Sequence, residues 1–80
     1  MVNIETRLLR LRKGLSPKVS QERLAQAAGV SRQWYHLLET GKQEHVSYTT
    51  ACNLLAAINA ERQARNMPII TLDDLNLTIV

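Results

Sequence analysis

The chain has 80 residues and a formal net charge of +3, and 45% of its residues are hydrophobic. This length predicts one small domain and argues against a full-sized enzyme with a cleft between two domains. The composition is typical of a folded globular domain rather than a disordered chain, and no apolar run approaches the roughly 18 residues that a membrane span needs.

Positive charge is concentrated in the first part of the chain. Residues 1–50 contain eight Lys and Arg against four acidic residues, whereas residues 51–80 contain two against three. The basic part is therefore the candidate for contact with a polyanion. A single cysteine, Cys52, rules out an internal disulfide, and the N-terminus lacks the unbroken apolar stretch of a signal peptide, so we expect a cytoplasmic protein.

The residue types needed for catalysis or metal binding are scarce. One cysteine and two separated histidines, His36 and His45, do not form a zinc ligand set, and no acyl-transfer motif surrounds them. We interpret Cys52 as a small buried apolar residue. We therefore expect no enzymatic activity, no metal and no cofactor.

Two helices are predicted before residue 30. The first spans about residues 3–13, because Ile4, Leu8 and Leu11 recur at helical spacing, and Gly14 with Ser16-Pro17 ends it. The second begins after Ser20, a good N-cap, and ends at Gly29, which adopts the left-handed conformation at little cost.

Two further helices follow. Ser31 is the expected N-cap of a third helix that ends at Thr40-Gly41, and its short connection to the second helix predicts a steep crossing angle. A fourth runs from Ser47 to about residue 59, or on to residue 66, and Pro68 limits its extension. Thr71 can cap one short turn over residues 72–75, after which Leu77, Ile79 and Val80 indicate an extended tail.

The segment 67–80 is too apolar for a solvated tail. We expect it to pack on the domain or on a second subunit, and interpret it as a C-terminal extension and dimerisation segment. The sequence thus divides into a domain at residues 1–66 and an extension at residues 67–80.

The third helix carries the candidate binding residues. If Tyr35 and Leu38 face the core, then at 100° per residue Gln33 and Leu37 face outward and His36 lies at the edge of that outer face. Long polar side chains then project from a short, firmly held helix. The major groove of B-form DNA admits one such helix.

Residues 20–42, SQERLAQAAGVSRQWYHLLETGK, resemble the helix-turn-helix of the Cro/phage-repressor family, also called Xre-like. The matching elements are Ser20-Gln21-Glu22, Leu24-Ala25, Gly29-Val30-Ser31-Arg32, the apolar pair Tyr35 and Leu38, and Glu39-Thr40-Gly41-Lys42. The resemblance implies an all-α, compact four- to five-helix bundle of the lambda-repressor type. It also implies binding of operator DNA, commonly as a dimer.

The resemblance assigns roles to individual residues. Arg32 and Gln33 match base-contacting positions at the start of the recognition helix, residues 31–39, and Leu37 matches another base-facing position. Gln21 and Lys42 match common phosphate contacts. With the helical register added, the expected base contacts are Arg32, Gln33, His36 and Leu37, and the expected phosphate contacts are Gln21, Ser31, Trp34 and Lys42.

These residue types suit the roles. Arg can pair with guanine and Gln with adenine, whereas Leu37 can only touch thymine methyl groups. The sequence departs from the family at Trp34, where a small polar residue is usual, and in a slightly longer connection at residues 14–19.

We interpret the chain as a sequence-specific reader of double-stranded DNA, a homodimeric prokaryotic or phage-type transcriptional regulator acting as a repressor on a palindromic operator. One alternative is an antitoxin that neutralises a protein partner and can autoregulate its operon. Another is a small RNA-associated or coactivator-type bundle that reads no DNA sequence.

Overall fold

A hydroxyl side chain begins each of the four α-helices. The computed structural model describes residues 6–80 and contains α1 (Arg7–Lys13), α2 (Gln21–Ala28), α3 (Arg32–Glu39) and α4 (Tyr48–Ala64). The four N-caps have extended backbones, and each accepts a hydrogen bond from the N–H three residues later; they are Thr6, Ser20, Ser31 and Ser47. The predicted caps at Ser20 and Ser31 and the start of the fourth helix are confirmed. In the described part of the chain the first helix spans Arg7–Lys13, and the expected start of this helix near residue 3 lies outside the described residues.

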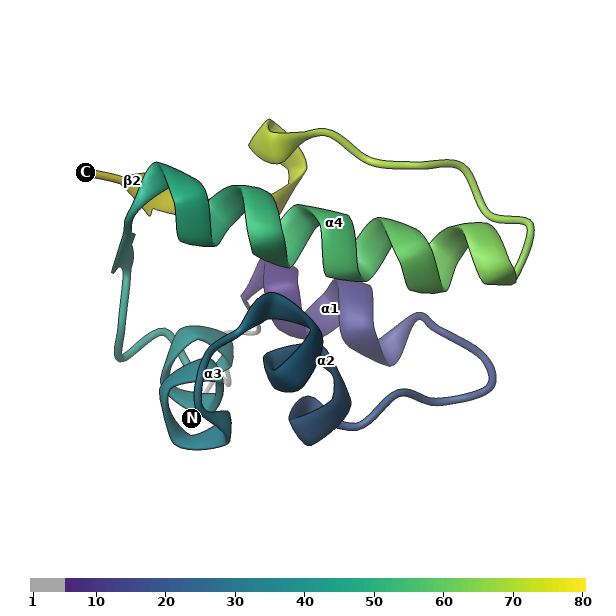
Figure 1. The fold of residues 1–80 in the computed structure, drawn as a ribbon, viewed down its shortest axis with the longest axis horizontal. Coiled ribbons are helices and arrows are strands. Elements are labelled where there is room, and N and C mark those ends of the chain that lie inside the picture. Colours follow the sequence, from purple (N-terminus) through teal and green to yellow (C-terminus); the bar gives the residue numbers. More distant parts are fainter. Residues whose placement is uncertain (1–5) are drawn as a thin grey trace, which may run out of the picture.

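The four helices enclose one hydrophobic core (Figure 1). The long helix α4 packs most extensively against α2, and α1 and α2 each contact α3. The core residues are Leu8, Leu15, Val19, Leu24, Ala25, Ala28, Tyr35, Leu38, Val46, Ala51, Leu54, Ala57, Ile58 and Leu75. The predicted inward residues of α2 and α3 are thus buried, with Val30 in the turn packing against the core.

Gly29 sets the angle between α2 and α3. Its φ of 75° is left-handed, and its N–H donates to the Ala25 and Gln26 carbonyls in the last turn of α2. Two residues later Ser31 caps α3. The predicted tight turn is confirmed.

The C-terminal segment returns along α4 and belongs to the same folded body. A 3₁₀ turn, η1 (Leu72–Leu75), contacts α4 and α1, and Leu75 is fully buried. Thr71 and Asp74 form a capping box at its start, as the position of Thr71 had suggested. Leu77 packs partly against the core.

The extended tail pairs with a strand that the sequence did not predict. Strand β2 (Thr78–Ile79) lies parallel to β1 (His45–Val46), with His45 opposite Thr78 and Val46 opposite Ile79. Backbone hydrogen bonds run from Thr78 N–H to the Glu44 carbonyl and from Val80 N–H to the Val46 carbonyl. The fold is the predicted all-α class with four helices, to which this short parallel pair is added.

Candidate nucleic-acid interface

Helix α3 is divided sharply between a buried and an exposed face. Tyr35, Leu38 and Glu39 are buried, with at most 1% of their surface accessible. Arg32, Gln33, His36 and Leu37, the four expected base contacts, are all exposed. The outward placement of these side chains follows the predicted register.

The four exposed side chains share one surface depression with Gln21 from the start of α2. Two elements therefore build it, and the steep α2–α3 turn brings them together. Arg32 and Gln33 come from the first turn of α3, while His36 and Leu37 lie one turn later. The depression can offer a cation, amide and imidazole hydrogen-bonding groups, and one apolar contact. This combination matches the donors, acceptors and methyl groups on base edges.

The remaining expected phosphate contacts flank this depression along the chain. Ser31 is exposed, and its oxygen accepts from the Trp34 N–H, so the hydroxyl hydrogen stays available for donation. Lys42 is exposed just beyond the turn that ends α3. Trp34 is half-buried and packs against the core, which leaves part of its ring at the surface.

A buried ion pair lies behind the depression and joins α1 to α3. Arg12 donates from Nε to Glu39 Oε2 at 2.6 Å and from Nη2 to Glu39 Oε1 at 3.0 Å. The Glu39 side chain is 1% exposed and that of Arg12 is 19% exposed. The hydrogen bonds from Arg12 to Glu39 raise the pKa of Arg12, so the guanidinium stays charged.

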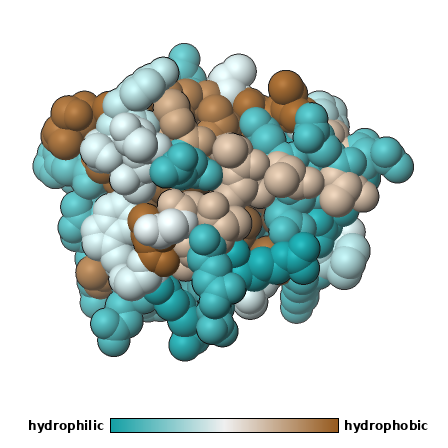
Figure 2. All heavy atoms as spheres, in the orientation of Figure 1, coloured by the Kyte–Doolittle hydropathy of each residue, from teal (hydrophilic) through white to brown (hydrophobic). Residues whose placement is uncertain are grey.

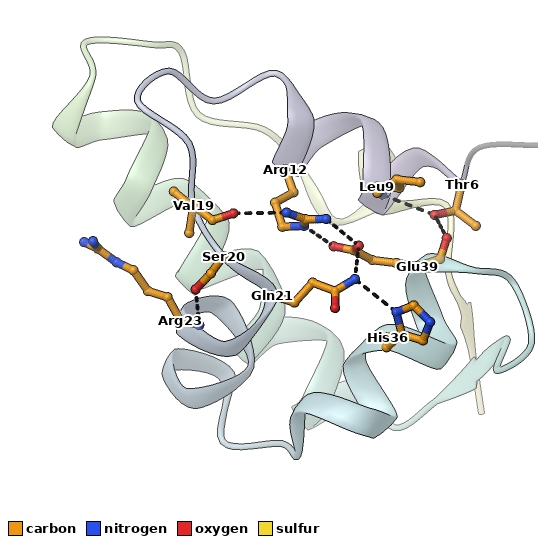
Figure 3. A network of polar contacts seen from close by, with 9 residues as sticks. All are labelled: Thr6, Leu9, Arg12, Val19, Ser20, Gln21, Arg23, His36 and Glu39. Carbon is orange, nitrogen blue, oxygen red and sulfur yellow. Dashed lines mark hydrogen bonds and ion pairs between the residues drawn. The ribbon is translucent and has the colours of Figure 1, made fainter.

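Gln21 connects this ion pair to the surface. Its Nε2 donates to Glu39 Oε1 at 2.8 Å and lies 3.1 Å from His36 Nδ1 (Figure 3). The chain of contacts therefore runs from Arg12 through Glu39 and Gln21 to the exposed His36. Sequence reasoning gave Arg12 no role and treated Glu39 only as part of a motif, so it missed this connection.

Tyr35 lies in the core beside the same carboxylate. Its hydroxyl is buried, and no hydrogen-bond partner for it occurs within residues 6–80. Burial, with the nearby Glu39 charge as a smaller cause, raises the pKa of Tyr35 far above its ordinary value. The ring therefore remains neutral and acts as the apolar support of α3.

A second buried glutamate lies on α4. Glu61 Oε2 pairs with Arg23 Nε from α2 at 2.8 Å, and Glu61 Oε1 pairs with Arg65 Nη1 at 2.8 Å. Arg65 also donates from Nη2 to the Pro17 carbonyl at 2.6 Å. This cluster ties α2 and the loop before it to α4. The cluster contains none of the residues that line the depression, and therefore none of the expected base-contacting residues.

The hydropathy of the surface differs between two sides of the molecule. In Figure 2, hydrophilic side chains predominate along the lower side, where α2 and α3 lie, while hydrophobic side chains gather at the upper left over the C-terminal strand.

Within residues 6–80, no group of three His, Cys, Asp or Glu side chains is placed to hold a metal ion. None of the helices in this part of the chain combines the length and apolar character of a membrane span.

One comparison with known proteins gave a match. A family model described as a helix-turn-helix domain matches residues 6–66, which is more than half of the chain. No curated protein and no solved structure matches the chain.

Proposed function

Because the chain belongs to the helix-turn-helix domain family, we propose that it is a sequence-specific reader of double-stranded DNA that acts as a prokaryotic or phage-type transcriptional repressor. Helix α3 enters the major groove, and Arg32, Gln33, His36 and Leu37 meet the base edges. The protein works by binding in the cytoplasm, without catalysis, metal or cofactor.

One observation carries this proposal. The four residues that sequence reasoning assigned to base contact are exposed on one helix and line one depression, while the opposite face of that helix is buried. A rigidly supported helix with such side chains suits direct readout, in which Arg pairs with guanine and Gln with adenine.

Phosphate contacts on either side would fix the register of the helix. Ser31, Trp34 and Lys42 provide a hydroxyl, an indole N–H and an ammonium group. At Gln21 the side-chain nitrogen already bonds Glu39 and His36, so we assign the phosphate contact there to the backbone N–H at the start of α2. The first N–H groups of a helix are unpaired and attract anions.

The regulator is proposed to bind a palindromic operator as a homodimer, with two α3 helices in successive major grooves about 34 Å apart. Exposed apolar side chains at the C-terminal strand support a self-interface: Val80 is 78% and Ile79 39% exposed, and Tyr48 at the start of α4 is 63% exposed. Deleting residues 67–80 would also remove the core residue Leu75. Val80→Lys is the sharper test, and it should shift the protein from dimer to monomer in analytical ultracentrifugation.

The DNA-binding proposal is tested by selection from a random duplex pool at about 50 mM and 200 mM salt, followed by sequencing. We expect enriched inverted repeats and an affinity that falls steeply with salt. Gln33→Ala should cost about 1–3 kcal/mol at one base position. Gln26→Ala, which removes an exposed glutamine elsewhere on α2, is the matched control and should bind normally. Weak binding that enriches no sequence would reject the regulator.

The antitoxin alternative draws support from the same apolar residues and from Ile69, which is 62% exposed after α4. Under this alternative, the apolar surface serves a foreign protein rather than a second copy. A chain that stays monomeric at high concentration and selects no DNA sequence would favour it over the repressor.

A further inference from the structure

The polar contacts behind α3 extend from Glu39 through Gln21 to Nδ1 of the exposed His36 (Figure 3). We propose that Gln21 is a positioning residue that holds His36 in the Nε2–H tautomer, so that His36 reads DNA as a hydrogen-bond donor. This inference rests on the proposed function, because it concerns the same depression on the surface of α3.

The first step concerns the orientation of the Gln21 amide. Glu39 is buried and bonded through both oxygens to the Arg12 guanidinium, so its carboxylate only accepts hydrogen bonds. The atom of Gln21 that lies 2.8 Å from Glu39 Oε1 must therefore be the amide nitrogen. The ion pair thus decides which way the amide faces.

The second step passes this orientation to His36. The same Gln21 nitrogen lies 3.1 Å from His36 Nδ1, and its second hydrogen is available there. A hydrogen on Nδ1 would face the hydrogen of the amide, so Nδ1 must accept. In a neutral imidazole one nitrogen donates when the other accepts, and the hydrogen then lies on Nε2.

The third step concerns what this tautomer can recognise. Nε2 lies on the side of the ring away from Gln21 (Figure 3), and His36 lines the depression together with Arg32 and Gln33. A donor at this position fits purine N7, guanine O6 or thymine O4. It does not fit the amino groups of adenine or cytosine, which are themselves donors. His36 therefore selects a base that presents an acceptor, and the side chains of Gln21, Glu39 and Arg12 act on DNA only through it.

The first test uses the free protein. A ¹⁵N spectrum of the imidazole rings at about pH 8, where an unperturbed histidine is neutral, should show His36 with hydrogen on Nε2 and none on Nδ1. His45, exposed on β1, serves as the internal reference. Gln21→Glu replaces the donor with an acceptor of nearly the same shape, so Nδ1 of His36 should then carry a hydrogen. A wild-type His36 with hydrogen on Nδ1, or a tautomer unchanged in Gln21→Glu, would overturn the proposal.

A second variant guards against loss of folding in Gln21→Glu. Gln21→Met keeps the length of the side chain without either hydrogen-bonding group, and circular dichroism would establish that it is folded. His36 in this variant should lose its preference and approach the tautomer ratio of His45. A ratio that stays at the wild-type value would equally contradict the role of Gln21.

The DNA readout uses the selected operator. Each purine in a half-site is replaced in turn by its 7-deaza analogue, which lacks the N7 acceptor. Each thymine is replaced by cytosine, paired with guanine, so that an amino group takes the place of O4. One replacement should weaken operator binding by the wild-type protein about threefold to tenfold, the range of a single net hydrogen bond. The same replacement should not weaken operator binding by the His36→Ala variant. Gln21→Met should lose the same discrimination while that of Arg32 and Gln33 persists, and Gln26→Ala should behave as wild type.

The outcomes separate this inference from the proposed function. If the protein selects an operator but His36 has no preferred tautomer, the proposed function stands and this inference is rejected. A fixed tautomer in a protein that selects no sequence rejects the DNA role of His36 together with the proposed function. If Arg32 and Gln33 discriminate between bases but no base position depends on His36, only the readout by His36 is rejected.

Discussion

Two buried glutamates each pair with arginines from other parts of the fold. The two clusters differ in the hydrogen-bond acceptors that the arginines would retain if the glutamate were removed. Glu39 binds Arg12 between α1 and α3, and Glu61 binds Arg23 and Arg65 between α2 and α4. Without Glu61, Arg65 would still donate to the carbonyls of Pro17 and of residue 61 itself. Without Glu39, Arg12 would keep just one acceptor within residues 6–80, the Val19 carbonyl. The value of a buried ion pair therefore depends on the alternatives left to the surviving charge.

The largest expected effect is that of Glu39→Ala. It leaves the partly buried Arg12 guanidinium with one hydrogen bond and removes the acceptor that orients Gln21. Breaking such a pair should lower the free energy of unfolding by about 3–5 kcal/mol. Urea unfolding followed by circular dichroism measures it. A loss below about 1 kcal/mol would mean that Arg12 finds solvent easily and that the pair does not stabilise the α1–α3 junction.

The helices and the outward face of α3 could be predicted because local signals specify them. Ser20, Ser31 and Gly29 mark helix ends by their own chemistry, and the spacing of Tyr35 and Leu38 sets which side of α3 is buried. The pairing of Arg12 with Glu39 is different in kind, because it joins residues 27 positions apart. On its own helix Arg12 looks like any charged residue off the apolar stripe.

The same limit explains the missed strand pair. The sequence indicated an extended tail at residues 77–80, but a parallel ladder also requires a partner segment, and residues 45–46 carry no strand signal of their own. Pairing between distant segments is decided by the tertiary fold and not by local propensity. The DNA contacts stay predictions for a related reason: exposure and chemistry define which groups can meet a base, whereas the bound duplex decides which ones do.

The second prediction makes the matched change at the other glutamate. Glu61→Ala should cost about 1–2 kcal/mol, less than Glu39→Ala, because Arg65 retains its carbonyl partners and Arg23 is already largely in solvent. Affinity for the selected operator should stay at the wild-type value, since no member of this cluster lines the depression. Equal losses of stability in the two variants would remove the contrast between the clusters.

The pH dependence of stability sharpens the contrast further. The hydrogen bond from Arg65, with smaller contributions from the Arg23 and Arg65 charges, holds the pKa of Glu61 below its ordinary value of 4.5. A lowered pKa in the folded state contributes stability above the unfolded value, and this contribution is lost as pH falls through the folded value. Below about pH 4.5, wild type should therefore lose stability more steeply than Glu61→Gln.

Above that pH the two curves should run parallel. Asp74, whose pKa is lowered mainly by the backbone hydrogen bond from Thr71, is present in both proteins and cancels in the difference. Thermal unfolding from about pH 3 to pH 7 measures both slopes. Curves that remain parallel through the acid range would show that Glu61 gains nothing from its arginines when ionised.

The smallest expected effect isolates exposure as the deciding factor. Arg23 and Arg12 both form an ion pair with a buried glutamate through Nε, at 2.8 Å and 2.6 Å, but the Arg23 side chain is 67% exposed and that of Arg12 only 19%. An exposed arginine in a surface ion pair is well solvated without its partner, so Arg23→Ala should change the free energy of unfolding by about 0.5 kcal/mol or less. Arg12→Ala leaves the buried Glu39 carboxylate with Gln21 as its remaining side-chain donor and should cost several times more. Comparable effects of the two substitutions in urea unfolding would mean that distance between the charges, rather than the solvent left to each arginine, sets the strength of these pairs.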